Sequence, residues 1–428
     1  MTRYDREILS LALPALGALA ADPLVSMVDT VFVGRLGTVP LAALGVNTSV
    51  FAFAFVVFNF LAYGTTPRVA REVGKGNRVG AGRLAIEAIV LAGVLGVGAL
   101  VALQLFAGPI LTVMGATGDL REPSLAYLRI RAFAGPALLL IMAAHGIFRG
   151  YQDTRTPLLV TLGLNGVNVI LDPLFIFGFG WGLEGAAWAT VAAQWIGAVW
   201  FLHLLLVSRR EELGIPLALP LPRDVLPFLR IGGELAIRTL SLIATLTLAT
   251  AVAARVGTVS VAAHQVGAQV WIFLALVVDA LAVAGQALVA KHRGGEGSAS
   301  ARGIANRLLL WGMAVGVLLA GVLSLFAPYL PRIFTNDPET LAAVATILPF
   351  VIWMQPLNAL VFVWDGIFIG AEDFRYLAVQ MVASGAAAAA VLLLVLPMDW
   401  GLAGVWWGII ALMGVRAATL AVRYRTVP

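Results

Sequence analysis

The chain has 428 residues, of which 61% are hydrophobic and 12% charged, and it carries a formal charge of +5 and no cysteine. Average soluble domains are about 25% charged, so this composition predicts a polytopic membrane protein. The lack of cysteine excludes disulfides, thiolate metal sites and cysteine nucleophiles. The positive charge indicates contact with anionic lipid, and we expect no nucleic-acid partner because no basic patch is interleaved with stacking aromatic side chains.

Apolar runs of about 20 residues, the length that crosses a bilayer, recur along the whole chain. We expect an all-α protein with about twelve transmembrane helices, which in chain order span residues 7–34, 41–70, 84–108, 122–148, 157–178, 184–207, 225–255, 261–290, 303–330, 340–368, 376–396 and 402–422. The first run continues into a long apolar pattern without a small-residue cleavage site, so we interpret it as the first helix and not as a signal peptide.

Basic residues concentrate in every second loop. The loops after the even-numbered spans carry most of them, as Arg71, Lys75 and Arg78 do after the second span, and both chain ends are basic. Cytoplasmic loops carry an excess of Lys and Arg. We therefore expect an inner (plasma) membrane protein with both termini in the cytoplasm.

Segments of the first half recur in the second half at a constant offset. RLGTVPLAALGV (35–46) matches RVGTVSVAAHQV (255–266), and HGIFRGYQDTR (145–155) matches DGIFIGAEDFR (365–375), both 220 positions later. A constant offset over most of a chain predicts an internal duplication. Because each half contains an even number of spans, the two halves insert with the same orientation and are related by an axis along the membrane normal.

The segment SRREELGIPLALPLPR (208–223) is the longest charged and proline-rich connector, and we place the lobe boundary there. It divides the chain into an N-terminal lobe, residues 1–215, and a C-terminal lobe, residues 216–428, with six spans each. The cleft between two such lobes is the expected substrate cavity.

The N-terminal lobe has acids in the middle of apolar helices. Asp172 lies in LNGVNVILDPLFIFGFG (164–180) and Asp29 in SMVDTVFVGR (26–35), each about six to eight residues below the outer end of its span. Thr190 lies at a matching depth in the sixth span. A charge inside a bilayer costs a few kcal/mol, so such residues are rare and functional by default.

Helical spacing places these polar residues on two faces. Asn165, Asn168 and Asp172 (i, i+3, i+7) lie on one face of the fifth helix, and Asp22 and Asp29 (i, i+7) lie on one face of the first. Each polar face needs a polar partner inside the membrane. We therefore expect the two helices to face each other.

Two buried acids at one depth have a defined chemistry. Burial disfavours the charged form of a carboxyl group and a neighbouring carboxylate disfavours it further, so such a pair titrates as a unit. We predict that Asp29 and Asp172, with Asn168 and Thr190 beside them, bind a coupling proton or cation. The alternative is that these residues only hold the helices together, at about 0.6 kcal/mol per hydrogen bond in a membrane.

Two prolines interrupt the first helix. Pro14 and Pro23 each remove a backbone donor and permit a bend, and we expect them to act as hinges.

Four other polar residues are secondary candidates, namely Asp22 and Asn165 in the N-terminal lobe and Asp279 and Asp365 in the C-terminal lobe. For Asp279 and its repeat partner Asn59, structural pairing is the favoured interpretation over a second cation site. Asp365 lies near the end of the tenth span, where we expect it to pair with a nearby arginine as a gate or brace.

Motifs for nucleotide hydrolysis and metal-dependent hydrolysis are missing. The sequence contains no G-x-x-x-x-G-K-[ST] loop and no H-E-x-x-H. We therefore expect neither an enzyme nor a cofactor-binding protein, and transport would draw its energy from an ion gradient.

Three segments together resemble one transporter family. MVDTVFVGRLGTVPLAALGV (27–46), GIFRGYQDTRTPL (146–158) and DGIFIGAEDFR (365–375) resemble the multidrug and toxic compound extrusion (MATE) family, in particular its DinF-like branch. The resemblance covers nearly the whole chain. It implies twelve helices in two lobes that form a V, and antiport of amphipathic, often cationic compounds against protons or sodium. Small substrates and membrane lipids are the implied partners, and we expect a functional monomer.

The resemblance also assigns site residues. In that branch the first helix carries an Asp and a bending Pro, the fifth an Asn and an Asp four apart, and the sixth a Thr. Asp29, Pro14, Asn168, Asp172 and Thr190 match them. The family therefore implies a proton site, or a Na⁺ site, at the four polar residues of this set.

One departure concerns the C-terminal lobe. A sodium-coupled subgroup places acids in the seventh and tenth helices, where this chain has Leu242 and Asn358. We therefore expect coupling in the N-terminal lobe.

Three other classes stay open. A lipid or glycolipid flippase of the same wider superfamily would have a more cationic cleft, and four arginines lie in or near spans, namely Arg129, Arg131, Arg238 and Arg416. A major-facilitator carrier also has six plus six helices, but REVGKGNRVGAGR (71–83) lacks its acidic and basic signature. A structural or sensory membrane protein would not need acids at matched depth.

Overall fold

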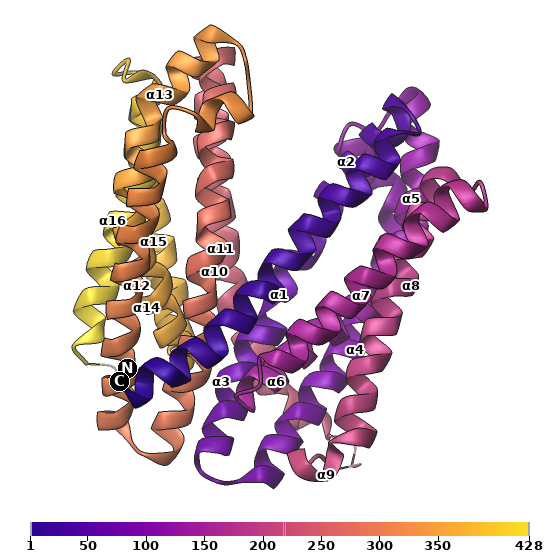
Figure 1. The fold of residues 1–428 in the computed structure, drawn as a ribbon, viewed down its shortest axis with the longest axis vertical. Coiled ribbons are helices and arrows are strands. Elements are labelled where there is room, and N and C mark those ends of the chain that lie inside the picture. Colours follow the sequence, from indigo (N-terminus) through magenta and orange to yellow (C-terminus); the bar gives the residue numbers. More distant parts are fainter. Residues whose placement is uncertain (1, 217, 219, 427–428) are drawn as a thin grey trace. The chain divides into compact units, whose positions relative to one another are not determined.

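The computed structural model describes residues 2–216, 218 and 220–426, and every regular element in them is a helix (Figure 1). The first half contains α1 (Arg3–Gly34), α2 (Thr38–Val56), η1 (Val57–Asn59), α3 (Phe60–Gly74), α4 (Arg78–Val113), η2 (Gly118–Leu120), α5 (Arg121–Ala132), α6 (Gly135–Gly150), α7 (Arg155–Pro173), η3 (Leu174–Gly178), α8 (Gly182–His203), η4 (Leu204–Ser208) and α9 (Arg210–Leu213). The second half contains α10 (Pro222–Val256), α11 (Thr258–Gly295), α12 (Ser298–Phe326), η5 (Leu330–Ile333), α13 (Pro338–Trp353), α14 (Gln355–Gly370), α15 (Phe374–Leu394) and α16 (Gly401–Tyr424).

The membrane spans agree with the prediction in number. Within the described chain, 10 helices are long and apolar enough to cross a membrane, and two bent helix pairs raise the total to as many as 12. The bent pairs are the predicted fourth and tenth spans, which the apolar pattern presents as continuous. They turn by 48° between α5 and α6 and by 50° between α13 and α14. Pro136 and Pro356 start the second helix of each pair, and a proline offers no N–H to continue the preceding helix.

The duplication predicted from the sequence is confirmed by matching contacts in the two halves. A Cβ atom on Gly96 would lie 2.5 Å from Cα of Pro136, and one on Gly316 would lie 2.7 Å from Cα of Pro356. Each half therefore needs a glycine where a long helix crosses the bend. Gln152 and Glu372 also correspond, with φ of 65° and 61°.

The described residues group into two compact units. The N-terminal unit is Leu13–Gly232, and the C-terminal unit combines the residues up to Ala12 with those from Gly233 onward. These units differ from a division at 215/216, because the first turns of α1 belong to the C-terminal unit and those of α10 to the N-terminal unit. The predicted lobes, residues 1–215 and 216–428, stay a prediction that rests on the sequence repeat and on the connector between the halves.

Buried polar contacts hold the first turns of α1 in the C-terminal unit. Asp5, only 1% exposed, accepts hydrogen bonds from Arg307 at 2.5 and 2.9 Å and from the indole of Trp311 at 2.9 Å. Glu7 lies 3.2 Å from the His292 ring. Such a charge-assisted fork is a strong contact, and no periodicity in the sequence predicts it.

The repeated motif after the fourth and tenth spans has a structural role in each unit. Arg209 donates to Asp153 at 2.7 Å, and Arg423 donates to the equivalent Asp373 at 2.9 Å. Each pair ties the loop after the bent span to the end of the last helix of its half. The motif residues therefore act as braces within each unit.

Candidate functional site

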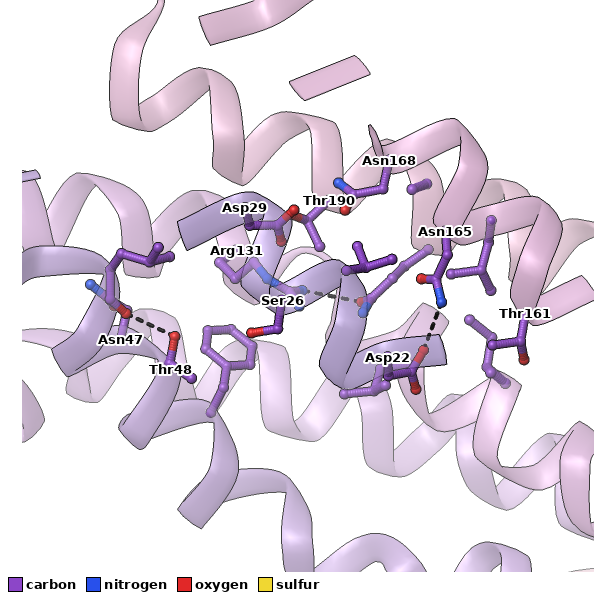
Figure 2. A pocket seen from close by; sticks show the side chains of 18 of the residues that line it. Asp22, Ser26, Asp29, Asn47, Thr48, Arg131, Thr161, Asn165, Asn168 and Thr190 are labelled. Carbon is purple, nitrogen blue, oxygen red and sulfur yellow. Dashed lines mark hydrogen bonds between the residues drawn. The ribbon is translucent and has the colours of Figure 1, made fainter. Parts of the chain in front are cut away.

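A cavity of about 260 Å³ lies within the N-terminal unit (Figure 2). Six helices form its wall: α1, α2, α5, α6, α7 and α8. Its polar lining consists of Asp22, Ser26, Asp29, Asn47, Thr48, Tyr127, Arg131, His145, Thr161, Asn165, Asn168, Thr190 and Gln194. The volume is near the lower end of small-ligand sites, which hold about 300–1,000 Å³.

The polar faces of α1 and α7 meet as the helical spacing predicts. Nδ2 of Asn165 donates to Oδ1 of Asp22 at 3.0 Å, and Figure 2 shows the two side chains reaching across from their helices. This bond satisfies an acid inside an apolar unit. Asp22 and Asn165 therefore hold α1 against α7 at one end of the cavity.

Two turns further along both helices, the structure brings two acids together. The carboxyl groups of Asp29 and Asp172 lie within hydrogen-bonding reach of each other. Asp172 is fully buried, and Nδ2 of Asn168 lies 3.5 Å from its Oδ1. Oδ1 of Asp29 and Oδ2 of Asp172 are buried and accept no hydrogen bond from the described residues. Two neighbouring carboxyl groups that each have a buried oxygen without a donor can be satisfied by a shared proton or by a cation.

Thr190 completes the predicted set. Its hydroxyl donates to the carbonyl of Ala186 one turn earlier in α8, at 2.9 Å, and Figure 2 places its side chain close to Asp29 and Asn168. A hydroxyl that gives its proton to a carbonyl presents only lone pairs to the cavity. Thr190 therefore lines the same cavity as Asp29 and Asn168, both of which interact with Asp172, and all four residues carry oxygen atoms.

Oxygen ligands of this kind fit a hard cation such as Na⁺. The amide nitrogen of Asn168 is directed at Asp172, so its oxygen is free to face another group. The described residues contain no group of three or more His, Cys, Asp and Glu side chains that could hold a metal ion. The donor set that fits a cation here is two carboxylates, one amide and one hydroxyl.

Arg131 was named from the sequence only as an arginine in or near a span, and its place in the cavity wall was not predicted. Arg131 of α5 donates from Nη1 to Oε1 of Gln194 on α8 at 3.1 Å, and its guanidinium lies 4.8 Å from the centre of the Phe51 ring. The sequence places Arg131 near a span, but the direction of its side chain depends on the bend after α5. The place of Gln194 in the cavity wall could have been predicted from the sequence, because Gln194 lies four residues after Thr190 and therefore on the same helix face.

In the C-terminal unit, Asp365 pairs with arginine as expected. Arg238 of α10 donates to its Oδ2 at 2.6 Å, and Arg416 of α16 donates to the same oxygen. The charge of Asp279 also acts on Arg416. These contacts tie α10, α14 and α16 together and already supply cationic partners to the acid.

Comparison with known families decides the identity of the fold. The MatE family profile matches this chain twice, at residues 14–174 and again at residues 235–395. The chain belongs to the MATE family. The two matches repeat the duplication seen in the sequence and in the glycine contacts.

Curated relatives of this MATE protein come from plants and bacteria. Protein DETOXIFICATION 44, chloroplastic, of Arabidopsis thaliana is 36% identical, and the alignment covers 99% of this chain and 83% of that protein. DNA damage-inducible protein F of Escherichia coli is 28% identical, with 99% and 93% covered. Probable multidrug resistance protein NorM of Thermotoga maritima is 28% identical over 78% of this chain and 73% of that protein. The resemblance to the DinF-like branch is thereby confirmed as homology.

Solved structures share the fold. An outward-facing multidrug resistance MATE family transporter of the MOP superfamily matches with a TM-score of 0.90 and 22% identity, covering 99% of this chain and 96% of that one. A MOP superfamily transporter from Pyrococcus furiosus, described by the reverse polarity of its binding pocket, matches with a TM-score of 0.91 and 22% identity over the same shares. The MATE architecture therefore holds along nearly the whole chain.

Three further positions considered in the sequence are Pro14, Pro23 and Asn358. Pro14 and Pro23 lie inside α1, which is helical from Arg3 to Gly34, and Pro14 comes just after the point where α1 passes between the units. Their role as hinges stays a prediction. Asn358, at the position of an acid in the sodium-coupled subgroup, is buried and its amide has no partner among the described residues.

Proposed function

We propose that this MATE transporter is a secondary active antiporter that exports amphipathic, often cationic compounds in exchange for protons. The observation that carries the proposal is the pair Asp29 and Asp172, whose buried oxygens Oδ1 and Oδ2 lack a donor. A proton held between these carboxyl groups supplies the missing bond. Losing that proton leaves a negative charge in the cavity, which attracts a cationic substrate.

The exchange follows from this competition. With the cavity open to the outside, the pair takes up a proton, its charge falls, and a bound cation loses its counter-charge and leaves. With the cavity open to the inside, the pair releases the proton and binds the next substrate. A proton can drive this cycle only if it binds the two states with different affinity. We assign that difference to a change in α1, bent at Pro14 or Pro23, which moves Asp29 relative to Asp172.

Na⁺ is the alternative coupling ion at the same residues. Asp29, Asp172, Asn168 and Thr190 all offer oxygen atoms, which supports Na⁺ binding. The proton is favoured because two carboxyl groups in contact can share one without further ligands. The proposed setting is a functional monomer in the inner membrane with both termini in the cytoplasm.

A lipid or glycolipid flippase is the second candidate. Arg131 in the cavity wall is the observation that favours it. Arg238 and Arg416 support it less, because both bind Asp365. A flippase would also need no acid pair without a donor.

The test is efflux of ethidium from reconstituted vesicles, with a pH gradient and a Na⁺ gradient imposed separately. We expect the pH gradient to drive efflux in the wild type and not in Asp172→Asn or Asp29→Asn. Asp119→Asn, at an exposed position between α4 and α5, is the matched control and should transport normally. Undiminished efflux by folded Asp172→Asn would overturn the proton site, and efflux driven only by Na⁺ would replace the proton with sodium.

A further inference from the structure

We propose that Arg131 binds an anionic group of the transported molecule, so that the cavity selects amphipathic compounds that carry a carboxylate. This inference rests on the proposed function, because it names the substrate class of the same cavity. It assigns to the cavity a second polar anchor, opposite in sign to the acids of α1 and α7.

Arg131 has donors to spare in the cavity wall. One nitrogen donates to Gln194 at 3.1 Å, and the flat guanidinium lies over Phe51. A guanidinium carries five N–H donors in a fixed fork. None of the nitrogens of Arg131 is a buried atom without a partner. Arg131 also forms a hydrogen bond with Tyr127. The N–H groups that remain after the bonds to Gln194 and Tyr127 are the donors that a ligand in this cavity can use.

Asp29, which lines the same cavity, does not form an ion pair with the guanidinium of Arg131. Asp29 and Arg131 act on each other electrostatically, and Figure 2 shows the two side chains in the same region of the cavity. Oδ1 of Asp29 nevertheless accepts no hydrogen bond from the described residues. Arg131 thus acts on Asp29 electrostatically without a hydrogen bond to this oxygen, and its N–H groups beyond the bonds to Gln194 and Tyr127 remain for a ligand.

The other three arginines that the sequence places in or near spans have different environments. Arg238 and Arg416 are both bound to Asp365. Arg129, two residues from Arg131 on α5, is exposed and lies outside the cavity wall. Among the described residues that line the cavity, Arg131 is the one arginine or lysine.

The chemistry of the site favours a carboxylate. An arginine inside a membrane protein is costly and marks a substrate or ion path by default. Its fork matches the two oxygens of a carboxylate, whereas a lysine offers only a point charge. Phe51 restrains the plane of the guanidinium from one side, and Gln194 restrains one nitrogen, so the fork is ordered before a ligand arrives. A preordered fork loses less entropy when it binds.

The test compares two dyes that differ by one carboxylate, rhodamine B and its ethyl ester. Binding to the purified, detergent-solubilised protein is followed by fluorescence anisotropy, without any gradient. We expect the wild type to bind the acid about tenfold more tightly than the ester, the size of a charge-assisted hydrogen bond. Arg131→Gln should abolish this preference, so that the acid no longer binds more tightly than the ester, and Arg131→Lys should retain part of it.

Arg129→Gln is the matched control and should keep the full preference. If Arg131→Gln fails to fold, as judged by its thermal midpoint and by ester binding, Arg131→Lys carries the test, because loss of the fork alone must lower the preference. Equal binding of both dyes by the wild type would overturn the proposal, as would an unchanged preference in Arg131→Gln. A protein that prefers the acid but shows no gradient-driven efflux would refute the antiport and leave the anchor standing. A protein that exports ethidium but binds both dyes equally would refute the anchor and leave the antiport standing.

Discussion

Asp29 of α1 and Asp172 of α7 bring their carboxyl groups together in the N-terminal unit, and each keeps a buried oxygen that receives no hydrogen bond from the described residues. The neighbouring Asp22 differs, because Asn165 donates to it at 3.0 Å. Asp22 and Asp29 of α1 thus differ: Asp22 has a hydrogen-bond donor, whereas Asp29 has a buried oxygen that a proton or cation would satisfy.

This difference predicts opposite effects on stability. Asp172→Asn supplies an amide donor to Asp29 and removes one of two like groups, so the thermal midpoint should stay equal or rise. Asp22→Ala leaves the Asn165 amide without its acceptor and should lower the free energy of unfolding by about 1–3 kcal/mol. Thermal unfolding of both variants in one detergent checks the pair. A larger loss in Asp172→Asn than in Asp22→Ala would show that the acid pair is structural.

The cluster around Asp365 should be the most sensitive polar contact of the C-terminal unit. Asp365→Ala leaves Arg238 and Arg416 without their shared acceptor, and Arg416 is only 1% exposed. Removing one partner of a buried ion pair costs about 3–5 kcal/mol. Asp373→Ala breaks a more exposed pair with Arg423, where about 0–1 kcal/mol is expected. Similar thermal midpoints for the two variants would contradict this ranking.

Helix α4 should respond differently to two nearby glycine substitutions. A Cβ atom at Gly96 would lie 2.5 Å from Cα of Pro136, whereas one at Gly98 would meet nothing within 4 Å. Gly96→Ala should therefore cost about 1–3 kcal/mol through overpacking. Gly98→Ala should gain up to about 1 kcal/mol from helix propensity. Gly316→Ala should behave like Gly96→Ala because of the duplication, and stabilisation by Gly96→Ala would contradict the close crossing.

The brace between Asp153 and Arg209 should be sensitive to acid. Burial alone would raise the pKa of Asp153, but hydrogen bonds from Thr156 and Arg209 outweigh it and hold the pKa below its usual value. A carboxyl group with a lowered pKa in the folded state stabilises the fold above its unfolded-state pKa, about 3.9. That contribution is lost as the pH falls through the folded-state pKa. Asp153→Asn should therefore lower the thermal midpoint at pH 7, and the gap to the wild type should narrow toward about pH 3. A gap of constant size across this range would exclude the ion pair as its cause.

The sequence predicted much of the acid side of the cavity. Residues three, four and seven apart share a helix face, so the register of Asn165 and Asp172 on one helix and of Asp22 and Asp29 on another could be inferred without a structure. Equal depth then predicted that the faces meet, and the bond between Asn165 and Asp22 agrees.

Arg131 could not be inferred in the same way. Its span was predicted as one continuous helix over residues 122–148, whereas the chain bends by 48° after α5. A bend changes which face of the helix points inward. The spacing of residues across the bend therefore does not predict the direction in which a side chain points. The packing of the first turns of α1 could not be predicted either. The contact of Asp5 with Arg307 joins residues that are far apart in the sequence, so no local sequence pattern indicates it.

The most direct measurement is proton release when a cationic substrate binds. Ethidium is added to the purified protein in weakly buffered, sodium-free solution that contains a pH indicator. The account predicts release of about one proton per bound ethidium from the wild type, because the acid pair shares one proton, and none from Asp29→Asn or Asp172→Asn. Ethidium binding by the wild type without any proton release would contradict it.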